Sequence, residues 1–252
     1  MPIPYLRTLT AAERSPKANY HLAGFLAFVA GAINAGGFLA VKQYTSHMSG
    51  IVSTMAEELA LGNMVVVLDG LGALLSFVAG AACSAVLINW ARRRRLHSEY
   101  AGPLLVEAAL LVCFGLLGGN MEMQEWLFVP LTVSVLCFVM GLQNAMITKV
   151  SRSEIRTTHV TGMVTDIGIE LGKLVYWNIG HHEGSAPVIA NRAKLWLLST
   201  LVGLFFVGGV VGAIGFKHIG FAFTTVFAGI LVALAVVPVI DDIALKLRRF
   251  GK

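Results

Sequence analysis

The sequence predicts an all-α, polytopic membrane protein with six transmembrane helices, arranged as a 3+3 inverted repeat with two extra motif helices. Two observations lead to this prediction. First, apolar residues make up 56% of the chain and charged residues only 13%, and several stretches of about 20 residues carry almost no charge, which is the length needed to cross a hydrocarbon core of ~30 Å. Second, one polar motif occurs twice, once in each half of the chain.

Six apolar stretches are long enough to be spans. They cover His21–Val41, Asn63–Ala91, Pro103–Gly119, Leu127–Thr148, Lys194–Phe216 and Gly220–Ile240. Two intervening segments, Thr45–Gly62 and Thr157–Asn178, are too polar for ordinary spans. We expect each of them to form a motif helix that is either re-entrant or interfacial, and the sequence leaves this choice open.

The distribution of basic residues predicts the orientation. The connection Met121–Trp126 contains no basic residue, whereas the alternate connections and both ends of the chain are rich in them, which is the pattern expected for cytoplasmic loops. These basic residues are Arg7, Arg14, Lys17, Arg92–Arg95, Lys149, Arg152, Arg156, Arg192, Lys194, Lys246, Arg248, Arg249 and Lys252. We therefore expect both termini in the cytoplasm. The N-terminal segment lacks the pattern of a signal peptide, so the first span should be retained.

This orientation divides the chain into four parts. Residues 1–20 form a cytoplasmic N-terminal segment and residues 21–119 the first three-span repeat. Residues 127–240 form the second repeat, which is inverted, and residues 241–252 a cytoplasmic C-terminal tail.

The duplicated motif supports the inversion. Gly31–Ala35 leads into Thr45–Leu59, and Gly141–Ala145 leads into Thr157–Leu171. Asn34 thus corresponds to Asn144 and His47 to His159, and the second copy has gained two residues between the parts of the motif. Three crossings separate the copies, so the halves should face opposite ways, with the first copy on the outer side and the second on the inner side. On this basis His47 and His159 are not expected to meet.

A weaker similarity extends the repeat. The segment that starts at Phe77 resembles the one that starts at Phe206. Inverted repeats of three spans are common in secondary transporters, and their sites lie near the midplane where the halves meet.

The motifs also indicate a family. The paired Asn-Ala and Thr-x-His-x-[Ser/Thr]-Gly motifs, together with Met140–Ala145 and Val160–Gly162, resemble those of the YoaK family of bacterial inner-membrane proteins, a domain family of unknown function. In that family an Asp is frequent where Asn34 stands, so a proton-carrying role at this position does not follow. The resemblance implies a fold and a location in the bacterial inner membrane, and no activity.

The candidate substrate-binding residues are the polar and small positions of the two copies. They are Asn34, His47, Ser49, Gly50, Gln143, Asn144, His159, Thr161, Gly162, Glu58 and Glu170. Each has a structural alternative. An amide inside a span can form a hydrogen bond between helices, a histidine can satisfy a turn instead of carrying a proton, and an acid at a span boundary can face lipid headgroups.

Hydroxyl residues before the motif helices suit N-caps. They are Thr45, Ser46, Ser49, Thr157, Thr158 and Thr161. If the motif helices are re-entrant, their N-termini would favour binding of an anionic or carboxylate-bearing solute near the centre of the membrane. If the helices lie at the membrane interface, the caps only stabilise the helix ends.

Two further features concern acids. Glu170 and Lys173 are spaced for a helical ion pair. Glu107 lies inside a predicted span without a motif mate, where a carboxyl is a functional hypothesis unless water reaches it.

Other functions are disfavoured. The net charge of +5 comes from clusters between apolar runs, so we expect no nucleic-acid binding. The three cysteines lie within apolar runs without ligand spacing, so we expect no metal and no cofactor. A small-solute transporter or channel ranks first, ahead of an integral membrane enzyme acting on a lipid or lipid-linked substrate, because catalytic motifs are missing. A non-catalytic membrane scaffold is the third hypothesis. The expected partners are membrane lipid and a small-molecule solute, and a homo-oligomer is left open.

Overall fold

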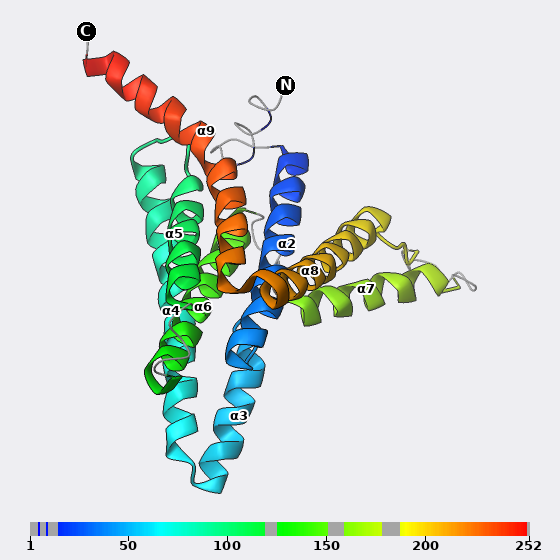
Figure 1. The fold of residues 1–252 in the computed structure, drawn as a ribbon. Helices are drawn as coiled ribbons and strands as arrows, with labels where there is room; N and C mark the ends of the chain where they lie inside the picture. The colour runs from blue at the N-terminus through cyan, green and yellow to red at the C-terminus, as the bar shows by residue number, and fades with distance from the viewer. Residues whose placement is uncertain are drawn as a thin grey trace.

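The regular elements of the described chain are all helices (Figure 1). The computed structural model of the 252-residue chain describes residues 15–118, 125–150, 159–177 and 187–250, together with Tyr5 and Leu9. In chain order the elements are α2 (Pro16–Val41), α3 (Met48–Leu61), α4 (Met64–Arg93), α5 (Ala101–Gly118), α6 (Glu125–Val150), α7 (Val160–Val175), α8 (Arg192–Ile219), the short 3₁₀ helix η2 (Gly220–Phe223) and α9 (Thr224–Phe250).

Helices form at all six predicted spans and at both motif segments. Four described segments are long and apolar enough to cross a membrane: Lys17–Leu39, Met64–Arg93, Val129–Val150 and Arg192–Arg248. The last of these contains both α8 and α9, and the apolar part of α5, Ala101–Leu116, is shorter. The helices therefore fit an integral membrane protein.

Three helix pairs organise the molecule. α2 packs most extensively against α8, α4 against α6, and α5 against α9. Large side chains such as Leu26, Phe114, Met140 and Phe227 are fully enclosed between these pairs. The start of α2 and the end of α9 lie at the same end of the bundle, and the last turns of α9 project away from it (Figure 1).

Close contact between α2 and α8 depends on glycine. A Cβ atom at Gly31 of α2 would overlap the carbonyl of Phe205 on α8, and one at Gly208 of α8 would overlap the carbonyl of Phe28 on α2. Helix backbones approach this closely only where the side chains between them are absent.

The crossing of α4 and α6 repeats this arrangement. A Cβ atom at Gly141 would overlap the carbonyl of Phe77, and one at Gly80 would overlap the carbonyl of Phe138. Gly141 thus takes the place of Gly31, as the repeated motif predicts, and Gly80 takes the place of Gly208.

The helix crossings also show how the weaker sequence similarity between the halves should be aligned. Phe77 precedes Gly80 by three positions, and Phe205 precedes Gly208 by three positions. The carbonyls of these two phenylalanines make the same contact, with Gly141 and Gly31 respectively. The predicted match of Phe77 with Phe206 is therefore wrong by one residue, because Phe77 occupies the position of Phe205.

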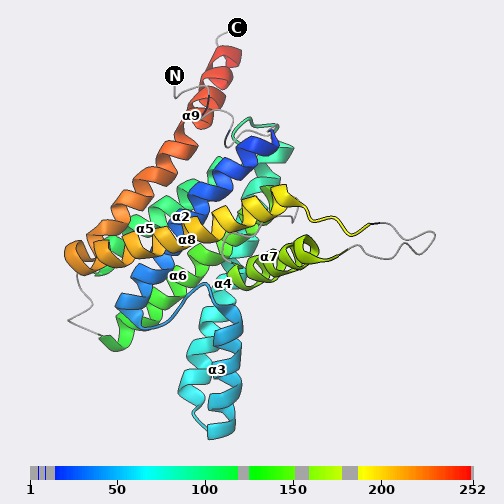
Figure 2. The same ribbon diagram turned by 90° about the vertical axis from the view of Figure 1, so that its right-hand side faces the viewer.

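The two motif helices each form a hairpin with the helix that follows. α3 turns into α4 at Gly62, whose φ of +79° is a left-handed conformation that glycine adopts readily. α7 packs against α8. Figures 1 and 2 show the α3–α4 hairpin and the α7–α8 hairpin projecting from the bundle in different directions.

α9 extends through the predicted C-terminal tail as far as Phe250. Its Asp242 carboxylate accepts hydrogen bonds from the backbone N–H groups of His97 and Ser98, at 2.9 and 2.8 Å. These bonds fix the turn before α5 to the C-terminal half of α9.

Candidate functional site

One cavity of about 990 Å³ is lined by both copies of the motif. It lies where α2, α4, α6 and α8 meet the beginnings of α3 and α7. Its lining includes three pairs of equivalent polar residues: Asn34 and Asn144, His47 and His159, and Ser49 and Thr161. The sequence places the two histidines on opposite sides, whereas in the structure both of them line this one cavity.

Asn34 ties the end of α2 to the loop that leads into α3. Its Oδ1 accepts hydrogen bonds from the Ser46 backbone N–H at 3.3 Å and from the Ser46 hydroxyl at 2.9 Å. Asn144 has no such bond recorded: its Oδ1 is buried and unpaired among the described residues. The residue equivalent to Ser46 is Thr158, which lies outside the described part of the chain.

The histidines occupy the N-cap positions of the two motif helices. His47 precedes α3 and His159 precedes α7, with φ, ψ values of −101°, 70° and −87°, 59°. Neither imidazole forms a capping hydrogen bond. The prediction that a hydroxyl residue caps each helix is wrong for Thr45, Ser46, Ser49 and Thr161 and lies outside the described residues for Thr157 and Thr158.

Gly50 and Gly162 make room for the two rings. A Cβ atom at Gly50 would lie 2.9 Å from His47 Nδ1, and one at Gly162 would overlap the His159 ring. The His-x-x-Gly spacing in each copy thus lets the imidazole lie over the first turn of its own helix. The two glycines shape the site without offering a side chain to a ligand.

The charge at the cavity is positive. Both motif helices begin at its wall and run away from it (Figures 1 and 2), so the partial positive charge of two helix N-termini is directed towards it. Lys149 also lines the cavity, and its Nζ donates to Asn89 Oδ1 at 2.9 Å. The described lining contains no Asp or Glu.

The matched acids do not line this cavity. Glu170 of α7 is buried, with Oε1 2.9 Å from Lys173 Nζ and Oε2 accepting the Asn191 backbone N–H at 2.7 Å. The hydrogen bond from Lys173, followed by that from Asn191, lowers the pKa of Glu170. This confirms the predicted Glu170–Lys173 pair as part of the contact between α7 and α8. Glu58 is half-buried near the end of α3.

Gln143 is also separate from the cavity lining. It is fully buried, and its Nε2 donates to Glu107 Oε1 at 3.1 Å. Glu107 Oε2 and Gln143 Oε1 have no partner among the described residues. The amide therefore joins α5 to α6 inside the bundle.

Sequence reasoning missed several lining residues. Phe77 and Phe205 line the cavity, and the signal for them was the spacing of the glycines whose backbones their carbonyls contact. Lys149 was assigned only to orientation, although it follows Asn144 by five residues on α6.

This geometry defines a protein whose described part consists of membrane-compatible apolar helices, with a cavity between its halves that both motif copies line. The chain belongs to the family described as "Protein of unknown function (DUF1275)", whose model matches residues 22–237. No curated protein and no solved structure gives a significant match to the chain.

Proposed function

We propose that this protein is a small-solute transporter or channel of the bacterial inner membrane and that the cavity of about 990 Å³ is its solute site. The observation that supports this most strongly is the lining, in which Asn34, His47 and Ser49 lie with their equivalents from the second motif copy. A lipid-acting enzyme and a scaffold give no comparable reason for two matched polar motifs at one cavity.

We also propose six spans arranged as an inverted 3+3 repeat. Support comes from the two glycine crossings, in which α2 meets α8 as α6 meets α4. Three crossings between equivalent points would turn the second half over, and the basic loops would place both termini in the cytoplasm. Transport sites at the contact between such halves are often formed by interrupted helices. In this protein the N-terminal ends of α3 and α7 would take that role.

The preferred solute would carry a carboxylate or another anionic group. Two helix N-termini and Lys149 contribute positive potential, the described lining contains no carboxylate, and the Asn, Ser and Thr side chains supply neutral hydrogen bonds. The helix N-termini, Lys149 and the neutral hydrogen-bonding side chains would all stabilise a bound anion. The same positive potential would disfavour binding of a cation.

Flux into liposomes tests the proposed function. Purified protein would be reconstituted and screened with small carboxylates, amines and metal cations. We expect carboxylate flux, with His159→Ala and Asn144→Ala each lowering it by about tenfold or more, as expected when a positioned polar contact is lost. Thr165→Ala is the matched control, because Thr165 is exposed on α7 outside the cavity lining. Absence of flux for every solute, or wild-type flux in both cavity variants, would contradict the proposal.

Single-cysteine labelling tests the inversion. In a background without Cys83, Cys113 and Cys137, Asn63→Cys at the tip of the α3–α4 hairpin should react with an impermeant maleimide only from outside the cell. Ile189→Cys, which precedes α8 and is 75% exposed, should react only from the cytoplasmic side. Labelling of both positions from the same side would rule out the inverted arrangement.

A further inference from the structure

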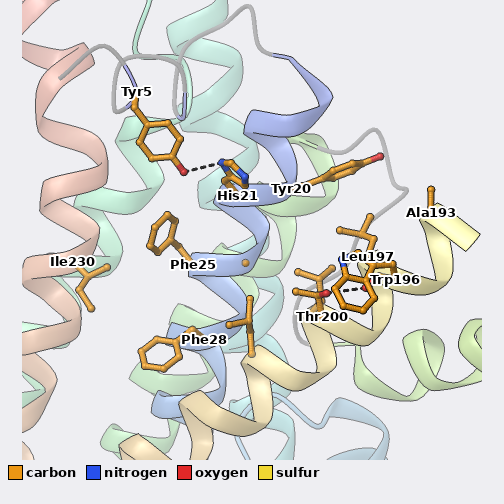
Figure 3. A pocket seen from close by; sticks show the side chains of 13 residues that line it. Tyr5, Tyr20, His21, Phe25, Phe28, Ala193, Trp196, Leu197, Thr200 and Ile230 are labelled. Carbon is orange, nitrogen blue, oxygen red and sulfur yellow. Dashed lines mark hydrogen bonds between the residues drawn. The ribbon is translucent and has the colours of Figure 1, made fainter. Parts of the chain in front are cut away.

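A second cavity lies between α2, α8 and α9, away from the two histidine motifs (Figure 3). Its volume is about 810 Å³, which is within the range of pockets that hold organic ligands. Its walls are successive turns of one face of α2 and one face of α8, and Ile230 of α9 lies across from them (Figure 3).

The cavity is polar at one end and apolar at the other. At the polar end the Tyr5 hydroxyl lies 2.8 Å from His21 Nδ1. Away from that end, Phe25 and Phe28 form part of the wall (Figure 3). This gradient matches an amphipathic molecule with an acyl chain and a polar headgroup.

Tyr20, next to His21, marks the level of the polar end, and Trp196 lies further along the α8 side of the cavity (Figure 3). Tyr20 is 42% exposed and Trp196 is 77% exposed, and both line the cavity. Tyr and Trp are enriched where a membrane protein meets the headgroup region. Since α2 and α8 lie in segments apolar and long enough to cross a membrane, their shared cavity is accessible to membrane lipid.

Basic side chains lie at the same end. Lys17 precedes His21 by four residues on α2, and Arg192 precedes Trp196 by four residues on α8, so each lies one turn before the cavity on the same helix face. Both are exposed. No Asp or Glu is found in the described lining. A headgroup at this level would therefore meet positive charge.

We propose that this cavity binds one acyl chain of an anionic phospholipid from the surrounding membrane, with the lipid phosphate held at the Tyr5–His21 end by Lys17 and Arg192. If the Tyr5 hydroxyl donates to His21 Nδ1, the Nε2–H of His21 is left as a donor for a phosphate oxygen. Basic pockets between membrane helices recognise anionic lipid headgroups in this way. The site is separate from the solute cavity, so it does not depend on the proposed transport.

The other half of the chain provides an internal control. When the two halves are aligned on the glycines of their crossings, Leu131 stands where His21 does, Leu68 where Trp196 does, and Met64 where Arg192 does. The corresponding face between α6 and α4 thus lacks the cationic and imidazole groups. One lipid is expected per chain.

Native mass spectrometry of the full chain tests the proposal. Delipidated protein in detergent would be titrated with dioleoyl-phosphatidylglycerol and, separately, with dioleoyl-phosphatidylcholine. We expect one phosphatidylglycerol to bind, at a concentration at least tenfold lower than phosphatidylcholine requires. Lys17→Gln with Arg192→Gln should remove that preference, because each basic charge near the headgroup contributes about fivefold. The charge-matched control, Arg93→Gln with Arg248→Gln, should leave the preference unchanged.

A space-filling variant tests the position of the acyl chain. Thr200→Trp would occupy the cavity and should abolish binding of phosphatidylglycerol, whereas Gly72→Trp, at the equivalent position of α4, should not. Equal binding of the two lipids by the wild type, or retention of phosphatidylglycerol by Thr200→Trp, would overturn the proposal. Thermal unfolding of each variant in detergent checks that it remains folded. If Thr200→Trp unfolds, the result for Lys17→Gln with Arg192→Gln tests the proposal: an unchanged preference for phosphatidylglycerol would overturn it.

Discussion

The two halves of this protein share their backbone contacts and differ in how their polar groups are used. α2 crosses α8 through Gly31 and Gly208, and α6 crosses α4 through Gly141 and Gly80. Each motif helix begins at an N-cap histidine that lies over a glycine. Positions that set the approach of helices are thus matched, and so are the Asn, His and Ser/Thr positions of the motif that line the shared cavity.

Outside these positions the halves differ. Gln143 on α6 bonds to the buried Glu107, but the equivalent residue on α2 is the fully buried Ile33. α7 is held to α8 by Asp166–Lys194 at 3.1 Å and by the contacts of Glu170, whereas α3 meets α4 through apolar contacts such as Met55 beside Gly70. The comparison indicates that both halves share the glycine crossings and the motif residues of the cavity. The polar contacts of Gln143, Asp166 and Glu170 occur in the second half only.

The largest expected effect comes from filling the crossings. Gly31→Ala and Gly141→Ala each place a methyl group against a backbone carbonyl, which cannot move without shifting its helix. We expect each to lower the free energy of unfolding by about 2–3 kcal/mol, the upper part of the usual range for overpacking. Thermal unfolding in detergent, followed by a thiol-reactive dye, measures this.

Gly203→Ala is the control for these variants. A Cβ atom at Gly203 meets no atom within 4 Å, and alanine is a better helix former than glycine, so stability should hold or rise. A large loss at Gly31 with none at Gly141 would show that the two crossings are not equivalent.

A smaller effect is expected from making the second half resemble the first. Gln143→Ile leaves the Glu107 carboxyl without its hydrogen-bond donor, which should cost about 1–3 kcal/mol. The double variant Gln143→Ile with Glu107→Leu should regain most of this loss, because a buried polar pair can be replaced by apolar residues of similar size at little cost.

Stability and liposome flux should be measured together for these variants. If the double variant is stable and transports normally, the Glu107–Gln143 pair is structural. A stable double variant without flux would instead make the Glu107–Gln143 pair part of the transport mechanism.

The sequence was informative where one pattern determined the outcome. Long apolar runs predicted the helices, the register of the repeated motif predicted that Gly31 and Gly141 are equivalent, and the three-residue spacing predicted the Glu170–Lys173 pair. The N-caps could not be predicted, because hydroxyls and histidine compete for that position and the choice depends on where Gly50 and Gly162 leave space. The contact of the Gln143 side chain could not be predicted either. Adjacent residues on a helix face different neighbours, and its partner Glu107 is 36 residues away.

The smallest effect expected is a pH-dependent loosening of α7 without a counterpart in α3. The pKa of Glu170 is lowered in the folded chain by Lys173 and the Asn191 N–H, so its contribution is present above the ordinary Glu pKa of about 4.3 and is lost as the pH falls through the lowered value. Because Lys173 is partly exposed, solvent screens the pair and this contribution should be small.

Hydrogen exchange in detergent should therefore show faster exchange in α7 than in α3 as the pH drops below about 4, after correction for the intrinsic rates. Glu170→Gln should show the faster α7 exchange already at neutral pH, whereas Glu58→Gln should leave α3 unchanged. Equal acid loosening of both helices would place the titrating group elsewhere and would remove the distinction between an ion-paired and an apolar motif hairpin.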